Sequence, residues 1–249
     1  MKPIYKRLIF FALLLGIWEL GGQIGLWAEI ILPPPTKVFT SLYVGITDMT
    51  LIYDLIASFR RLIIGLVIAL LIGTSIGVLI AKSKTADDTI GSMLLAFQSV
   101  PSIVWLPLAI MWFGLNEQAV IFVVILGGTF VMAINVRTGI KNVHPLYIKA
   151  AQTMGSSGID LFIRVIFPAS IPHLVTGSRL AWAFAWRALI AGELLTTGPG
   201  LGYTLSYASD FGDMSLVIGV MIIIGVIGSI VDQLIFQRVE KSVARRWGL

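Results

Sequence analysis

Long apolar segments recur along the whole chain and are separated by short polar stretches. Six of them approach or exceed the roughly 20 residues that a helix needs to cross the hydrocarbon core of a bilayer. These segments cover about 8–26, 57–81, 90–113, 117–136, 172–195 and 214–236. A backbone in hydrocarbon must satisfy its own hydrogen bonds, and the segments lack the alternation of barrel strands. We therefore expect an all-α fold, with residues 1–249 forming one polytopic membrane domain of about six transmembrane helices.

The composition supports a lipid environment and argues against several functions. Hydrophobic residues make up 57% of the chain and charged residues 12%, whereas soluble domains average about 25% charged residues. The net charge is +5, but the cations lie in short loops and form no contiguous basic face, so we expect no nucleic-acid partner. The sequence has no cysteine and only two histidines, His144 and His173. We therefore predict neither a metal cluster nor a cofactor.

The distribution of Lys and Arg predicts the orientation of the chain in the membrane, because cytoplasmic loops carry an excess of both. If the N-terminus is inside, thirteen of these cations fall on the inner side and three on the outer side. We therefore expect both termini to be cytoplasmic. The inner set is Lys2, Lys6, Arg7, Lys82, Lys84, Arg137, Lys141, Lys149, Arg164, Arg238, Lys241, Arg245 and Arg246, and the outer set is Lys37, Arg60 and Arg61.

Proline and small residues predict local features of the helices. Pro101 and Pro107 each remove a hydrogen bond from the third segment, which should be kinked or broken. The stretch from Leu32 to Pro35 opens a surface segment that we expect to be amphipathic. A smooth stripe along the second segment serves either as a sliding surface or for static helix packing. It is formed by Gly65, Ala69, Gly73, Gly77 and Ala81.

Five charged residues inside the predicted spans are candidates for a special role, since a charge there needs a partner or a wet cavity. Arg179 and Asp232 should lie at similar depth, so we predict that they pair. Arg187 lies about 22 Å from the inner end of its span, beyond the middle of the hydrocarbon. It either faces a translocation cavity and attracts an anionic cargo, or pairs with Glu19. Glu193 is the fifth charge.

The longest inner segment, 137–171, predicts two short helices. The first opens near Pro145 and ends at Gly155, and the second begins around Ser157 to Asp160. Small side chains let a helix sink into a groove on another protein. The pair Ala150-Ala151 therefore predicts a docking helix.

This segment resembles the cytoplasmic loop of binding-protein-dependent ABC importer permeases. Their pattern is Glu-Ala-Ala, three residues, Gly, nine residues and Ile-x-Leu-Pro. Lys149 occupies the Glu place and Phe167 the Leu place. Other fragments narrow the resemblance to the nitrate, sulfonate, taurine and bicarbonate branch. The matching loop positions are Ala150, Ala151, Gly155, Val165 and Pro168, and the other fragments are 18–20, 32–35, 101–114, Glu193 with 200–203, and the tail 245–247.

The resemblance implies a multi-pass subunit of a bacterial cytoplasmic (inner) membrane importer that moves a small solute. The implied partners are a second permease copy, two cytoplasmic ATP-binding subunits and an extracytoplasmic solute-binding protein. The ATPases would grip the 145–157 helix at Pro145, Lys149, Ala150, Ala151, Met154 and Gly155. Independently, the chain has no Gly-x-x-x-x-Gly-Lys-Ser/Thr phosphate loop, so we expect it not to be an enzyme and a partner to hydrolyse the ATP.

Alternatives remain open at this point. The cargo is either an anion such as a sulfonate, taurine, nitrate or bicarbonate, or an uncharged vitamin precursor. A secondary transporter would show internally repeated spans and no docking helix. A channel would need a filter-like segment, which we do not find.

Overall fold

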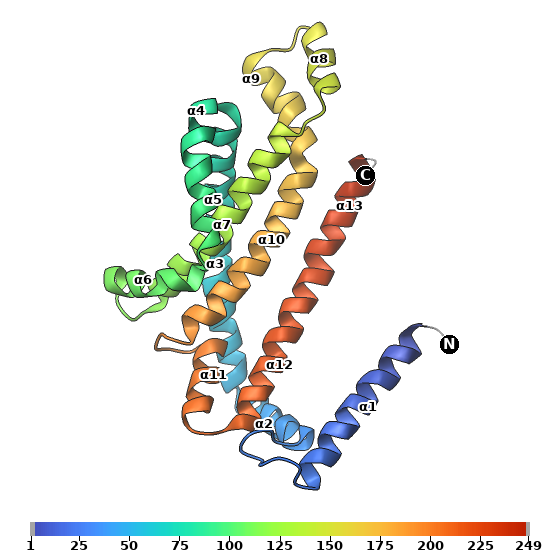
Figure 1. Ribbon diagram of the computed structural model, residues 1–249, viewed down its shortest axis with the longest axis vertical. Helices are drawn as coiled ribbons and strands as arrows, with labels where there is room; N and C mark the ends of the chain where they lie inside the picture. The colour runs from blue at the N-terminus through green and yellow to red at the C-terminus, as the bar shows by residue number, and fades with distance from the viewer. Residues whose placement is uncertain (1–2, 248–249) are drawn as a thin grey trace. The chain divides into compact units, whose positions relative to one another are not determined.

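The computed structural model describes residues 3–247, and every regular element assigned in that range is helical (Figure 1). Lys2, one of the predicted inner cations, lies outside the described residues, as does the side chain of Arg7. Four helical stretches of the described chain are long and apolar enough to cross a membrane, and a bent pair of helices raises the number to five. The four are Thr50–Lys82, Glu117–Lys141, Gly158–Glu193 and Met214–Trp247.

The third predicted segment, 90–113, does not form one straight span. Its two halves, Lys84–Ser99 and Ser102–Phe113, meet at 98°. The break follows from Pro101, which is extended (φ −54°, ψ 134°) and has no N–H to donate. The predicted break is therefore confirmed, whereas Pro107 sits in the first turn of its helix and is tolerated there. The elements are α4 Lys84–Ala86, η1 Asp87–Gly91, α5 Ser92–Ser99, η2 Ser102–Trp105 and α6 Leu106–Phe113.

The first predicted segment, 8–26, ends earlier in the structure than predicted. Helix α1 covers Pro3–Gln23, and its apolar part is Leu8–Gln23. The chain turns after it, with Gly25 at a positive φ of 74°, which a glycine adopts without steric cost. The ring of Trp27 folds back so closely that a Cβ on Gly21 would lie 2.2 Å from it. The helix therefore ends before the apolar sequence does.

The described chain forms two compact units. The first comprises 3–58 and 193–226, and the second comprises 59–192 and 227–247. The helices α3 (Thr50–Lys82), α10 (Phe167–Glu193) and α12 (Met214–Val231) each contribute to both.

In the first unit, α1 is joined to α2, which covers Pro35–Thr47. The predicted surface segment is therefore helical, with Pro35 at its first position, where a missing N–H costs nothing. The carboxylate of Glu19 accepts hydrogen bonds from the backbone N–H of Thr36 at 3.1 Å and from its hydroxyl at 3.0 Å. A negative charge at this end of a helix is favourable. Glu19 therefore caps α2.

In the second unit, α7 (Glu117–Lys141) lies between α3 and α10, as Figure 1 shows. The small-residue stripe of α3 meets α7, since a Cβ on Gly73 would lie 2.7 Å from Met132 Cβ and one on Gly77 2.6 Å from the Ala133 carbonyl oxygen. On the other side, a Cβ on Gly139 would lie 2.6 Å from His173 Cβ of α10. The stripe therefore serves close helix packing here.

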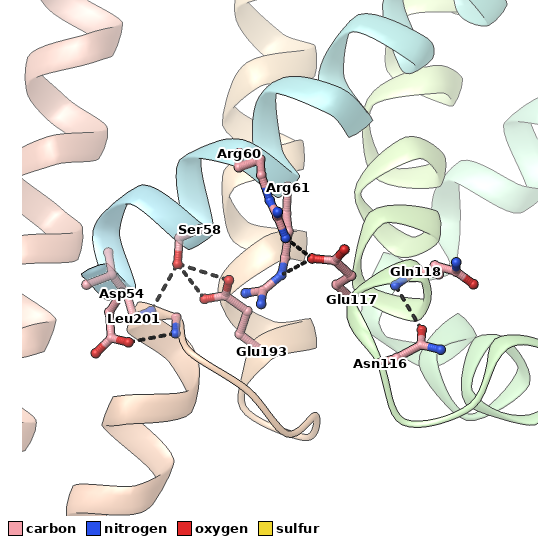
Figure 2. Close-up of polar contacts among 10 residues, drawn as sticks. Asp54, Ser58, Arg60, Arg61, Asn116, Glu117, Gln118, Glu193 and Leu201 are labelled. Atoms are coloured by element: carbon pink, nitrogen blue, oxygen red, sulfur yellow. Dashed lines mark hydrogen bonds and ion pairs between the residues drawn. The ribbon is translucent and has the colours of Figure 1, made fainter. Parts of the chain in front are cut away.

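Two of the predicted outer cations lie within the helix that forms the second predicted segment. Arg60 and Arg61 belong to α3, which begins at Thr50, earlier than the predicted start at 57. Both are ion-paired with Glu117, the first residue of α7 (Figure 2). The preceding residue, Asn116, caps α7 by accepting a hydrogen bond from Gln118 N–H at 2.9 Å.

Candidate functional site

The predicted docking helix is α8, Pro145–Thr153. His144 Nδ1 accepts a hydrogen bond from Leu146 N–H at 3.2 Å and so caps its start. At its end, Gly155 has a φ of 89°, and Ser156 N–H donates to the Ala151 carbonyl at 3.0 Å. This is the usual glycine-terminated helix end. The start and the glycine stop are as predicted, but the helix closes at Thr153 and not at residue 157.

The chain then re-enters a helix near the predicted place. Helix α9 covers Gly158–Leu161 with Ser157 as the residue before it. It continues through the π-helical η3, Phe162–Ile166, into α10. The two short helices expected in the inner segment are therefore both present.

The residues predicted to dock are divided between two environments. Ala151 is 3% exposed and packs within its own chain. Pro145, Lys149, Ala150, Met154 and Gly155 are exposed. Neighbours in the same chain therefore cover most of Ala151, and the contact of both alanines with a partner stays a prediction.

A groove of about 640 Å³ runs beside α8. Tyr147 and Ala150 of α8 line it, together with Met154 directly after α8, His173 of α10 and Trp247. Trp247 belongs to α13 (Gln237–Trp247), and its indole N–H donates to the Pro168 carbonyl at 3.2 Å. The indole thereby joins the end of the last helix to the start of α10.

The predicted intramembrane pair between Arg179 and Asp232 is present. Two parallel hydrogen bonds of 2.8 Å join the guanidinium to the carboxylate, the bidentate geometry in which such pairs are strongest. Arg179 also donates to Glu240 at 2.6 Å, and Glu240 accepts a further bond of 2.8 Å from the Thr176 hydroxyl. Glu240 was not predicted as a member of this cluster.

Glu193 is fully buried and holds the start of a helix in the first unit. Its carboxylate accepts hydrogen bonds from the Ser58 hydroxyl at 2.8 Å and from Gly202 N–H at 3.0 Å. Figure 2 shows Ser58 between Glu193 and Leu201, whose N–H donates to the Ser58 oxygen at 2.9 Å. Helix α11 covers Leu201–Asp210, so Glu193 and Ser58 satisfy N–H groups that a helix leaves unpaired at its start.

Asp54 completes this cluster. Its carboxylate accepts a hydrogen bond from Gly200 N–H at 2.9 Å and another from the Thr204 hydroxyl. Three consecutive N–H groups, those of residues 200 to 202, are thus bound by side chains. Neither Asp54 nor Ser58 was predicted as a functional residue, although their spacing of four places both on one face of a helix.

Arg187 lies in the second unit and lines a cavity of about 240 Å³. Its guanidinium lies 5.9 Å from the ring centre of Phe184. Within residues 3–247 the structure gives Arg187 no hydrogen bond and no carboxylate partner. Within the second unit, Arg187 is therefore separate from the cluster of Arg179 with Asp232. Within the first unit, Glu193 and Glu19 bind different groups.

Comparison with known proteins identifies the family. Residues 69–245 match the binding-protein-dependent transport system inner membrane component. The chain belongs to this family. It is thus the permease component of an ABC importer. Proteins of this family are the membrane components of transport systems.

Relatives of the permease agree along nearly its whole length. An ABC transporter permease protein of Methanocaldococcus jannaschii is 35% identical over 93% of this chain and 88% of its own. The taurine transport permease of Escherichia coli is 30% identical over 89% and 82%, respectively. The nitrate import permease of Leptolyngbya laminosa is 29% identical over 91% and 83%.

Solved structures share the fold of the permease. A chain of the MetNI methionine ABC transporter in an inward-facing conformation superposes with a TM-score of 0.70 at 19% identity, over 79% of this chain and 98% of its own. At this identity the likeness concerns the fold alone. The all-helical architecture is therefore that of ABC importer permeases.

Replacing Gly200 with Ala is expected to destabilise the permease by about 1–3 kcal/mol, because an added Cβ overpacks a site that has little room to adjust. That Cβ would lie 2.7 Å from the carboxylate carbon of Glu193, and the carboxylate is fixed by Ser58 and Gly202. Thermal unfolding of the purified protein in detergent measures the effect. Gly225→Ala is the matched control, since nothing lies within 4 Å of its added Cβ. Equal unfolding temperatures for the two variants would contradict the packing argument.

Proposed function

We propose that this permease, as a single membrane domain, forms the path of an importer for a small anion and that two separate cytoplasmic ATPase subunits drive it through α8. A second copy of the chain completes the path, and an extracytoplasmic solute-binding protein delivers the cargo. Both termini and α8 lie on the cytoplasmic side of the bacterial inner membrane. The observation that carries the proposal is the set of exposed apolar side chains on and beside α8.

These side chains are Leu146, Tyr147 and Met154, which are 64%, 60% and 81% exposed. They lie between the long apolar stretches Glu117–Lys141 and Gly158–Glu193 and belong to neither, so lipid does not explain their exposure. Exposed apolar groups that cluster outside a membrane span indicate a protein contact. Ala150 is exposed and small. Because no bulky side chain projects at this position, α8 can enter a groove on a partner protein.

The proposed anionic cargo is supported by the relatives and by one residue. Two relatives are named for taurine, which carries a sulfonate, and for nitrate. Arg187 is a cation in an apolar helix without an acidic partner among the described residues. An uncharged vitamin precursor is the alternative cargo, and uptake of each class by the assembled importer distinguishes them. Uptake without ATP or an ATPase partner would instead indicate a secondary transporter.

Replacing Ala150 with Trp should weaken ATPase binding about tenfold, which corresponds to about 1.4 kcal/mol. The reason is steric, because the indole ring would keep α8 from fitting closely into the groove of the ATPase. Ala150 is exposed, so thermal stability of the permease alone should stay unchanged. In reconstituted vesicles, uptake per ATP hydrolysed should fall. Gly155 gives a less direct test, since its φ of 89° makes any side chain there strain the end of the helix.

Gln152→Trp provides the matched control for this prediction. Gln152 is exposed on the same helix, but two positions along, which places it on nearly the opposite face. It should bind the ATPase and couple as the unmodified permease does. Equal coupling by both variants would contradict the role of this face of α8.

A further inference from the structure

A cavity of about 240 Å³ lies in the second unit at the break of the third apolar segment. It is bounded by the break itself, by α7 and by the outer part of α10. Most of its wall is apolar, and its polar side chains are Gln98, Ser102 and Arg187. An apolar site with a few convergent polar groups is typical of small-ligand binding.

The charge of this cavity is positive and unbalanced. Arg187 contributes a guanidinium, and no acidic residue lines the cavity. Two other arginines of the second unit are paired, Arg137 with Asp87 and Arg179 with Asp232 and Glu240. A cation inside an apolar helical segment normally has a partner or faces a wet cavity. Since the described part of the chain supplies no acidic partner for Arg187, an anion from outside is the complementary ligand.

One part of the cavity wall has irregular backbone. Helix α5 ends at Ser99 and η2 begins at Ser102, with Val100 and Pro101 extended between them. Non-helical backbone at membrane depth is tolerated where it is buried in protein or lines a polar cavity. The break therefore places the extended backbone of Val100 and Pro101 in the wall of the cavity.

A glycine keeps this wall close to α7. A Cβ on Gly127 would lie 3.5 Å from the Ser102 hydroxyl oxygen and 3.2 Å from Ala188 Cβ. Larger residues at this position would press on the Ser102 hydroxyl and on the wall next to Arg187. The break after α5 and Arg187 of α10 thus lie around the same small cavity.

We infer that this cavity binds the charged group of the transported anion. The guanidinium of Arg187 pairs with an oxyanion, for which its planar fork of donors is suited. The Ser102 hydroxyl and the Gln98 amide donate to the remaining oxygens. The ligand class is a small singly charged oxyanion, such as a sulfonate, nitrate or bicarbonate. This inference rests on the proposed function, because it assigns the residues that receive the cargo.

The test uses the importer assembled with its ATPase and solute-binding protein in vesicles, with taurine, nitrate and bicarbonate as probes. Arg187→Gln should lower uptake of the transported anion about tenfold, a loss of about 1.4 kcal/mol, while assembly and ATP hydrolysis persist. Arg187→Lys should retain part of the uptake, because it keeps the charge and loses the fork. Arg238→Gln is the matched control, since Arg238 is an arginine with no acidic partner in the described chain that does not line this cavity.

Four outcomes overturn the inference. One is equal anion uptake by Arg187→Gln and Arg238→Gln, which would leave the proposed importer function intact. Another is loss of assembly in Arg187→Gln that Glu19→Gln restores, which would make Arg187 structural. If Arg187→Gln fails to assemble for any other reason, the Ser102→Ala variant tests the site instead. It should lower anion uptake severalfold. Unchanged uptake by this variant would exclude the site. Uptake of only uncharged solutes by the unmodified importer would instead refute the anionic cargo itself.

Discussion

Replacing Glu193 with Ala is expected to destabilise the permease by about 3–5 kcal/mol, because the loss strands buried hydrogen-bond donors and leaves a cavity. Glu193 is 0% exposed. Donors that lose this acceptor include the Ser58 hydroxyl and Gly202 N–H. Glu193→Gln should cost less, since its amide carbonyl still accepts one of these bonds. Chemical unfolding of the purified protein in detergent, followed by tryptophan fluorescence, measures both variants.

The control for this prediction is Glu29→Ala. Glu29 is in the same unit and pairs with Lys37, but its side chain is 56% exposed. Exposed ion pairs contribute at most about 1 kcal/mol, so this variant should unfold almost as the unmodified protein does. A loss at Glu193 no larger than that at Glu29 would show that the hydrogen bonds at the start of α11 do not stabilise the fold.

Replacing Arg179 with Ala is expected to destabilise the permease by about 3–5 kcal/mol, more than loss of either acid with which it pairs. Asp232 and Glu240 would both lose their cation and would lie near each other uncompensated. Asp232→Ala should follow, since it removes a bidentate pair, and Glu240→Ala should have the smallest effect because Arg179 keeps Asp232. Thermal unfolding in detergent gives the order of the three variants.

Exchanging the charges of Arg179 and Asp232 extends this test. The double variant should be more stable than the sum of the two single changes, because each new side chain again faces an opposite charge. Arg164 and Asp160 are the matched control, as their pair is 78% and 46% exposed and its loss should change stability little. Strictly additive effects at 179 and 232 would contradict the pairing energy.

The sequence predicted the apolar helices well, because hydropathy depends on local composition. The ends of these helices were predicted less accurately, since helix ends depend on caps and turns. The second span was expected from 57 but begins at Thr50. Because the predicted helix started too late, it did not include Asp54. Asp54 and Ser58 lie on one helix face only if the helix includes both, so their cluster at the start of α11 was not predicted.

Individual site residues were predictable where one strong constraint acted on them. Arg179 and Asp232 were expected to pair because charges are costly at similar depth in apolar spans. The burial of Ala151 was not predictable, since small residues suit both a partner's groove and the chain's own interior. Pro101 predicted the break, but not its angle of 98°, which depends on packing against other helices.

The π-turn at Asp232–Phe236 has a consequence for the spacing of acidic residues along the last helix. Glu240 follows Asp232 by eight positions, which in a regular α-helix places the two side chains about 80° apart around the axis. A π-turn takes up one extra residue, so the angle between the two acidic side chains around the helix axis falls to about 20°. Both acids can therefore reach Arg179. In evolutionary terms the turn equals a one-residue insertion. A related chain with a regular α-helix here is therefore expected to carry the two acids seven positions apart and to align with this one through a single-residue gap.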